Sequence, residues 1–177
     1  ANRASDVISR IRGFLKRGGP HRTQVHVGEM IGDVISLVQD AARTHGVSLQ
    51  DKSAADLPPV VADRVQLQQV ILNLVKNAIE AMSSVKEQQR ILEVGVDRYR
   101  ADAVLVAVRD SGVGLDPQHR DRIFDAFYTT KSEGMGMGLA ISRSIIEAHG
   151  GRLWAIPNDG PGETFQFTLP IGAQGRS

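Results

Sequence analysis

Segments with helical periodicity alternate along this chain with segments of strand character, and this alternation restricts the folds open to it. Apolar residues at helical spacing predict three long helices, over residues 30–45, 65–82 and 139–149. Apolar alternation and β-branched runs predict strands over residues 23–27, 47–50, 91–97, 103–109, 152–156 and 164–169. Because the last two strands follow one another like a hairpin, we expect an α/β two-layer sandwich, a mixed sheet with helices on one face, and not a doubly wound parallel sheet.

Capping and turn-forming residues separate these segments. Asp63 is expected to cap the long middle helix, Gly46 to stop the helix before it, and residues 58–59, both proline, to form a loop. We also expect a turn over residues 100–102 and a short helix over residues 118–127.

The first 20 residues differ from the rest of the chain. Residues 2–17 carry apolar positions four, three and four residues apart, which predicts an amphipathic helix ended by Gly18-Gly19-Pro20. Six Lys or Arg residues against one acid in residues 1–23 raise the question of nucleic acid, but the apolar seam favours helix packing, and we expect no nucleic-acid partner. Two interpretations stay open: the end of a longer helical bundle, or a surface helix docked on its own domain.

Composition excludes several classes of protein. Without cysteine there is no disulfide, thiolate zinc site or cysteine nucleophile, which fits a reducing compartment. No apolar run approaches the ~18 residues that a membrane-spanning helix needs, and Ala1 opens no signal peptide. We therefore expect a soluble, cytoplasmic chain of one domain plus an appendage, with membrane attachment of a parent protein left open.

Two asparagines lie one turn apart on the long middle helix. Asn73 and Asn77 face the same way, with Lys76 between them in the sequence. An amide oxygen suits a hard cation such as Mg²⁺. The alternative is that both amides satisfy nearby polar groups within the fold.

Two glycine-rich segments complete the candidate site. Asp110 ends a strand and is followed by Gly112 and Gly114, so its carboxylate could accept from an exocyclic amine beside bare backbone, or simply form a turn. Residues 134–139 place three alternating glycines before a helix, an arrangement that presents N–H groups to phosphates, with Lys131 upstream. The segment fits neither a dinucleotide-binding fingerprint nor a phosphate loop, and the sequence has no zinc-protease or nucleophile-elbow motif.

Taken in order, these segments resemble the catalytic ATP-binding domain of two-component sensor histidine kinases. The N box, first glycine box, F box and second glycine box match residues 73–81, 110–114, 124–131 and 134–139. The resemblance also takes in the closing strand at residues 162–170, covers about residues 24–170, and is greatest to the nitrogen- and oxygen-responsive branch.

This resemblance implies the Bergerat fold, shared with gyrase-type and chaperone ATPases, with Mg²⁺-ATP bound under a lid of residues 115–133. Asp110 would bond the adenine amine with support from Thr164, and Asn77 would ligate Mg²⁺. Asn73 and Lys131 would be the catalytic residues. The other expected ATP-binding residues are Lys76, Gly112, Gly114, Arg122, Thr130, Gly134, Met135, Gly136, Met137, Gly138 and Leu139.

The family resemblance also implies what the chain acts on. Hydrolysing members of the superfamily carry a glutamate base where Asn73 stands, so we expect the γ-phosphoryl group to be kept for a histidine. None of the five histidines here is followed by an acid, so the acceptor would lie on a hairpin domain of the same protein, of which residues 1–20 would be the end. Residues 21–172 would be the catalytic domain and residues 173–177 a tail. The implied partners are a response regulator receiver domain and, in the full-length protein, a second copy.

Two other functions are weighed against this one. An ATPase of the gyrase or chaperone kind shares the fold and is disfavoured by Asn73. An anti-sigma-like module that binds a partner protein and uses nucleotide only as a switch is the second alternative.

Overall fold

The computed structural model describes residues 21–86, 88–126 and 138–172, and it contains the mixed sheet expected from the sequence. Five strands form the main sheet in the order β2 (Val47–Asp51), β4 (Arg90–Tyr99), β5 (Ala103–Arg109), β7 (Glu163–Pro170) and β6 (Leu153–Pro157). β2 runs parallel to β4, whereas every other neighbouring pair is antiparallel. The β6–β7 hairpin predicted from the sequence is confirmed.

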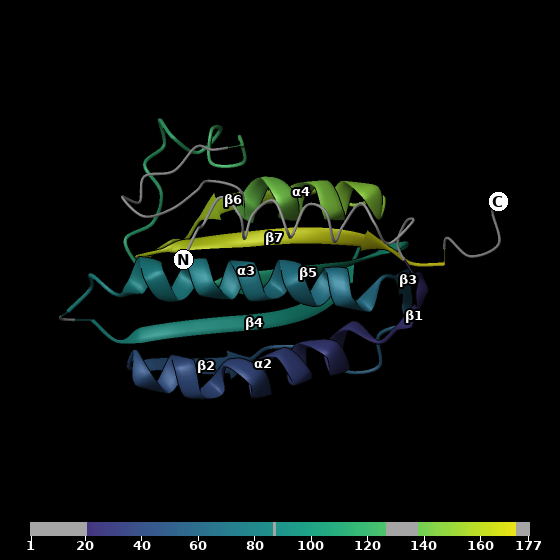
Figure 1. Ribbon diagram of the computed structural model, residues 1–177, viewed down its shortest axis with the longest axis horizontal. Coiled ribbons are helices and arrows are strands. Elements are labelled where there is room, and N and C mark those ends of the chain that lie inside the picture. The colour runs from purple at the N-terminus through teal and green to yellow at the C-terminus, as the bar shows by residue number, and fades with distance from the viewer. Residues whose placement is uncertain (1–20, 87, 127–137, 173–177) are drawn as a thin grey trace, which may run out of the picture.

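Three helices cover one face of this sheet (Figure 1). They are α2 (Val27–Thr44), α3 (Arg64–Met82) and α4 (Gly138–Ala148). α2 packs over β2 and β4, α3 over β4 and β5, and α4 over β6 and β7. The predicted two-layer α/β sandwich is therefore confirmed for the described part of the chain.

The core lies between the helices and the sheet because alternate residues of each strand point to the same face. In β5, Val104, Val106 and Val108 are each at most 1% exposed, whereas Leu105 and Ala107 between them are only partly buried. Burying one valine or leucine side chain contributes about 1.5–3 kcal/mol relative to leaving it exposed. This alternation fixes which face of each strand can hold a site beneath the helices.

Both predicted helix boundaries are confirmed. Asp63 Oδ1 accepts a hydrogen bond of 3.1 Å from the backbone N–H of Gln66, which satisfies one free donor of the first turn of α3. α2 ends at Thr44 with His45 as its C-cap, and Gly46 follows with a φ of +66°, a conformation that glycine adopts without strain.

One strand was missed by the sequence analysis and one predicted helix was wrong. The loop expected at residues 58–59 is confirmed, but the sequence analysis missed β3 (Val60–Ala62), which follows it at once and pairs antiparallel with β1 (Thr23–Val25). Three residues are too few to show a strand period. Residues 117–124 form consecutive turns in place of the predicted short helix, with backbone hydrogen bonds from a donor to the residue three before it, as from Arg122 to His119.

Several predicted features lie outside the described residues. These are the helix over residues 2–17, the tail 173–177, and residues 127–137, which include Thr130, Lys131, Gly134, Met135, Gly136 and Met137. Among the described helices, none is both long and apolar enough to cross a membrane.

Candidate functional site

Asp110 is a buried carboxylate at the end of β5. Its Oδ1 accepts hydrogen bonds from the backbone N–H groups of Gly112 at 2.8 Å and Glu163 at 3.3 Å. Burial raises the pKa of Asp110 above its ordinary value, and the two backbone donors oppose that shift. Since both bonds go to Oδ1, no described residue bonds Oδ2, which is therefore available to accept from a ligand.

The turn after Asp110 packs tightly against the last turn of α3. A Cβ added at Gly112 would lie 2.6 Å from the backbone oxygen of Ala81, and Gly114 has a φ of +74°. Glycine at position 112 is thus required by the helix behind it, and at position 114 by the backbone conformation. Val113 between them is 69% exposed.

Asn73 and Asn77 have different surroundings on α3. Asn73 Nδ2 donates to the Ser142 hydroxyl of α4 at 3.2 Å, and a Cβ on Gly138 would collide with the Asn73 side chain. Asn73 therefore joins α3 to the start of α4, which is the structural role that the sequence left open. Asn77 is partly buried one turn later, while Lys76 is exposed.

Gly138 and Leu139 begin α4, and Gly138 lies against Asn73, so the N-terminus of this helix lies next to that asparagine. Its first N–H groups are the kind that binds phosphate. The rest of the predicted phosphate loop falls outside the described residues. Arg122, the other predicted phosphate-side cation that is described, is exposed.

Thr164 connects to Asp110 through a third residue. Its hydroxyl donates to Asn158 Oδ1 at 2.5 Å, and Asn158 Nδ2 donates to the backbone oxygen of Asp110 at 2.7 Å. As neighbours in β7, Thr164 and Glu163 point to opposite faces of the sheet. Thr164 thus holds the backbone of Asp110 from the helix-free face and does not approach its carboxylate.

Sequence reasoning missed the ion pair beside Asp110. Glu163, with 3% of its side chain exposed, receives Arg120 Nε at 3.0 Å and Nη2 at 3.2 Å. A signal was present in the sequence, because Glu163 shares the face of β7 with Phe165 and Phe167, where a charge needs a partner. No local sequence pattern identifies its partner, since Arg120 is 43 residues away.

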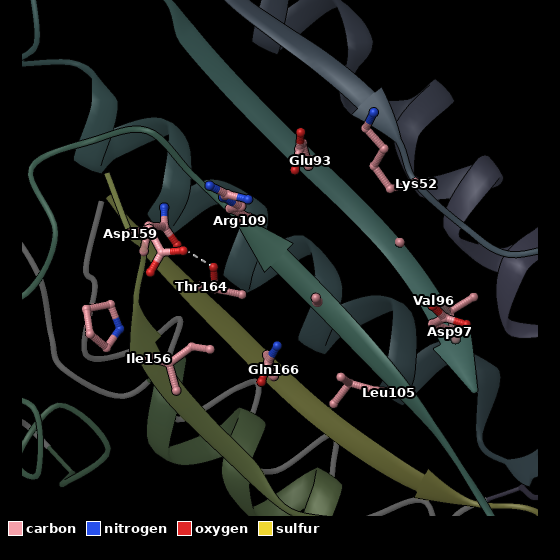
Figure 2. A pocket seen from close by; sticks show the side chains of 14 residues that line it. Lys52, Glu93, Val96, Asp97, Leu105, Arg109, Ile156, Asp159, Thr164 and Gln166 are labelled. Carbon is pink, nitrogen blue, oxygen red and sulfur yellow. Dashed lines mark hydrogen bonds between the residues drawn. The ribbon is translucent and has the colours of Figure 1, made fainter. Parts of the chain in front are cut away.

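A cavity of about 460 Å³ lies on the opposite, helix-free face of the sheet (Figure 2). Among those predicted site residues that the structure describes, Thr164 alone lines it. Charged side chains of both signs also surround it, among them Lys52, Glu93, Asp97 and Arg109. This hollow is therefore separate from the Asp110 carboxylate and from the asparagines of α3.

The described residues at this site offer few ligands for a magnesium ion. Within residues 21–86, 88–126 and 138–172 there is no group of three or more His, Asp or Glu side chains that could hold a metal ion. Asn77 would supply one neutral oxygen, and Mg²⁺ commonly takes other ligands from phosphate and water. The donor chemistry therefore fits an ion that enters with a nucleotide.

Comparison with known proteins identifies the fold and its family. Residues 62–173 match the family model described as histidine kinase-, DNA gyrase B- and HSP90-like ATPase. The catalytic domain of histidine kinase ThkA is 30% identical, with a TM-score of 0.75, over 85% of this chain and 97% of that domain. This chain belongs to that ATPase family. It is a histidine-kinase catalytic domain.

Two further relatives are much longer than this chain. The sensor protein FixL of Bradyrhizobium diazoefficiens is 43% identical over 96% of this chain, which spans 33% of FixL. Full-length ShkA, solved in complex with AMPPNP, is 27% identical, with a TM-score of 0.75, over 86% of this chain and 31% of ShkA. The kinase domain thus spans about a third of the length of these two proteins.

Proposed function

We propose that this kinase domain binds the adenine of ATP through Asp110. The observation that carries the proposal is the position of its carboxylate, which is buried at a strand end with Oδ1 occupied by two backbone donors. Oδ2 can then accept from the exocyclic amine, and a buried acceptor discriminates strongly for a ligand that donates to it. Asn158 and Thr164 hold the backbone of Asp110 in place.

The phosphates lie, in this proposal, between α3 and the start of α4. Asn77 would ligate Mg²⁺, and the bound ion would neutralise part of the phosphate charge. The N-terminus of α4 at Gly138 and Leu139 donates to phosphate oxygens, together with the preceding residues Gly134, Met135, Gly136 and Met137. Lys76, Arg122, Thr130 and Lys131 complete the phosphate side. The AMPPNP complex of ShkA supports nucleotide binding by a domain of this fold.

The γ-phosphoryl group passes, we propose, to a histidine of a hairpin domain and from there to a response regulator receiver domain. Asn73 carries an amide, which cannot take a proton from water near neutral pH, so hydrolysis stays slow. The five histidines of the chain are followed by Arg, Val, Gly, Arg and Gly, so none has the acid that the acceptor motif requires. A cytoplasmic, dimeric parent kinase completes the proposal.

Replacing Asp110 tests the proposed adenine contact. We expect Asp110→Ala to weaken ATP binding about tenfold to a hundredfold in calorimetry, since the adenine amine loses its acceptor in a buried site. Asp97→Ala, on an exposed part of β4, is the matched control and should bind ATP like the unchanged chain. Equal ATP affinity for Asp110→Ala and Asp97→Ala would remove Asp110 from the site.

A further inference from the structure

The ion pair between Arg120 and Glu163 lies directly beside the proposed adenine acceptor. β5 and β7 pair in register from Ala103 opposite Pro170 to Arg109 opposite Thr164, which places Asp110 opposite Glu163. The backbone agrees, because Asp110 N donates to Glu163 O at 3.0 Å. Side chains of directly opposed residues lie on the same face of a sheet, and like charges in this arrangement repel. Asp110 and Glu163 are thus two neighbouring buried carboxylates.

Arg120 supplies the positive charge for this pair of acids. Its guanidinium binds both oxygens of Glu163, a geometry that fixes orientation as well as charge. Its Nη2 also lies 3.5 Å from the backbone oxygen of Leu115, within the segment that follows Gly114. The arginine side chain is 24% exposed and the glutamate 3%, so solvent screens the contact little on the acid's side.

We propose that Arg120 and Glu163 are positioning residues for adenine recognition, because their ion pair lets Asp110 stand as a free acceptor next to a second buried acid. The inference rests on the proposed function of Asp110. The pair does not touch adenine in this scheme. It removes the repulsion that would otherwise favour a proton on one of the two carboxylates, and a protonated Asp110 would lose its preference for an amine.

The structure supports this role over a purely mechanical one. Repulsion from Glu163 is among the causes that raise the pKa of Asp110, after burial itself. Removing one partner of a buried ion pair leaves an uncompensated charge, whereas removing both charges is often tolerated. The proposal therefore predicts that the effect of losing Arg120 depends on whether Glu163 is charged.

Base discrimination provides the measurement. ATP donates from its exocyclic amine, whereas inosine triphosphate has an oxygen at that position and cannot. We expect the unchanged chain to bind ATP more tightly, and Arg120→Ala to lower the ratio of ATP to inosine triphosphate affinity by about threefold to tenfold. The double variant Arg120→Ala with Glu163→Gln should restore most of the ratio. Arg64→Ala, which breaks the exposed ion pair with Asp33, is the control.

Each outcome decides one of the two proposals. If the unchanged chain binds both nucleotides equally, the proposed function of Asp110 fails. If it discriminates and Arg120→Ala discriminates equally well, or if the double variant is as impaired as Arg120→Ala, the inference about the ion pair is overturned and the function of Asp110 stands. Circular dichroism monitors folding, and Arg120→Gln replaces Arg120→Ala if the alanine variant unfolds, with the same expected loss of discrimination.

Discussion

At the scale of single residues, one helical turn separates two asparagines with different surroundings. Asn73 donates a hydrogen bond to Ser142, and its side chain lies against Gly138. Part of its role is therefore to hold α3 and α4 together. Asn77 lies one turn nearer the end of α3 and is partly buried. The two side chains should therefore respond differently to substitution.

For Asn77, the proposal predicts a loss of magnesium-dependent binding. Asn77→Ala removes an oxygen ligand, while alanine is the best helix former and leaves α3 intact. We expect calorimetry to show that added Mg²⁺ no longer strengthens ATP binding in this variant. ATP binding that is equally strong with and without Mg²⁺ in the unchanged chain would contradict the assignment.

For Asn73, the proposal predicts a gain of hydrolysis. Asn73→Glu places a carboxylate where the ATPases of this superfamily carry their base, and general-base assistance contributes ~10²- to 10⁴-fold when the geometry is right. We expect steady phosphate release above the background of the unchanged chain. Asn73→Gln, which is as long as glutamate but cannot act as a base, is the matched control. A glutamate variant no faster than the glutamine variant would show that this position does not limit hydrolysis.

At the scale of elements, polar contacts join α3 and α4 at both ends of their shared face. Asn73 meets Ser142 near the start of α4. At its other end, the buried His149 accepts a hydrogen bond of 3.0 Å from the backbone N–H of Asp63, the N-cap of α3. His149 Nδ1 lies 2.8 Å from the backbone oxygen of Ile145, so it donates there and the ring is neutral.

This contact predicts a pH-dependent stability. Burial lowers the pKa of His149 below its ordinary value of 6.5, aided by the nearby charge of Arg22. The unfolded chain then binds more protons than the folded chain just below that pH. The free energy of unfolding should therefore be at its full value above about pH 6.5 and decrease as the pH falls through the window below it.

Denaturant titrations at several pH values measure this effect. We expect His149→Ala to lose ~1–3 kcal/mol at neutral pH, because the buried N–H of Asp63 is left without an acceptor, and to lose the histidine's share of the pH dependence. His45→Ala, which changes an exposed histidine at the end of α2, is the control. An unchanged pH dependence in His149→Ala would show that another group titrates.

At the scale of the whole molecule, the proposed function gives this chain the nucleotide half of a phosphoryl transfer. We expect it to stay unlabelled when incubated alone with γ-labelled ATP and Mg²⁺, since transfer needs an acceptor imidazole within ~3.5 Å of the γ-phosphorus and in line with the leaving oxygen. A separate hairpin domain carrying a histidine followed by an acid should become labelled, weakly, because tethering is lost. Acid-labile, alkali-stable label on the chain itself would show that one of its own histidines is an acceptor.

The sequence by itself determined the fold class and most of the elements, because periodicity and caps are local. Buried and partly exposed residues alternate over residues 103–109, as expected for a half-buried strand. The capping carboxylate of Asp63 marks the start of α3. The candidate residues Asp110, Asn73 and Asn77 stand out for the same reason, since each belongs to a short pattern. Three residues were too few for the sequence analysis to find β3, and the short helix predicted over residues 118–127 was wrong, because residues 117–124 form turns that do not continue as a helix.

Only the tertiary structure decided which polar side chains meet. Arg120 reaches Glu163 across 43 positions and Asn73 reaches Ser142 across 69, and no local period encodes contacts at such separations. They follow from the β5–β7 register and from the packing of α4 against α3. The β5–β7 register also places Thr164 on the helix-free face and Glu163 on the core face, because adjacent residues of a strand point to opposite sides of the sheet.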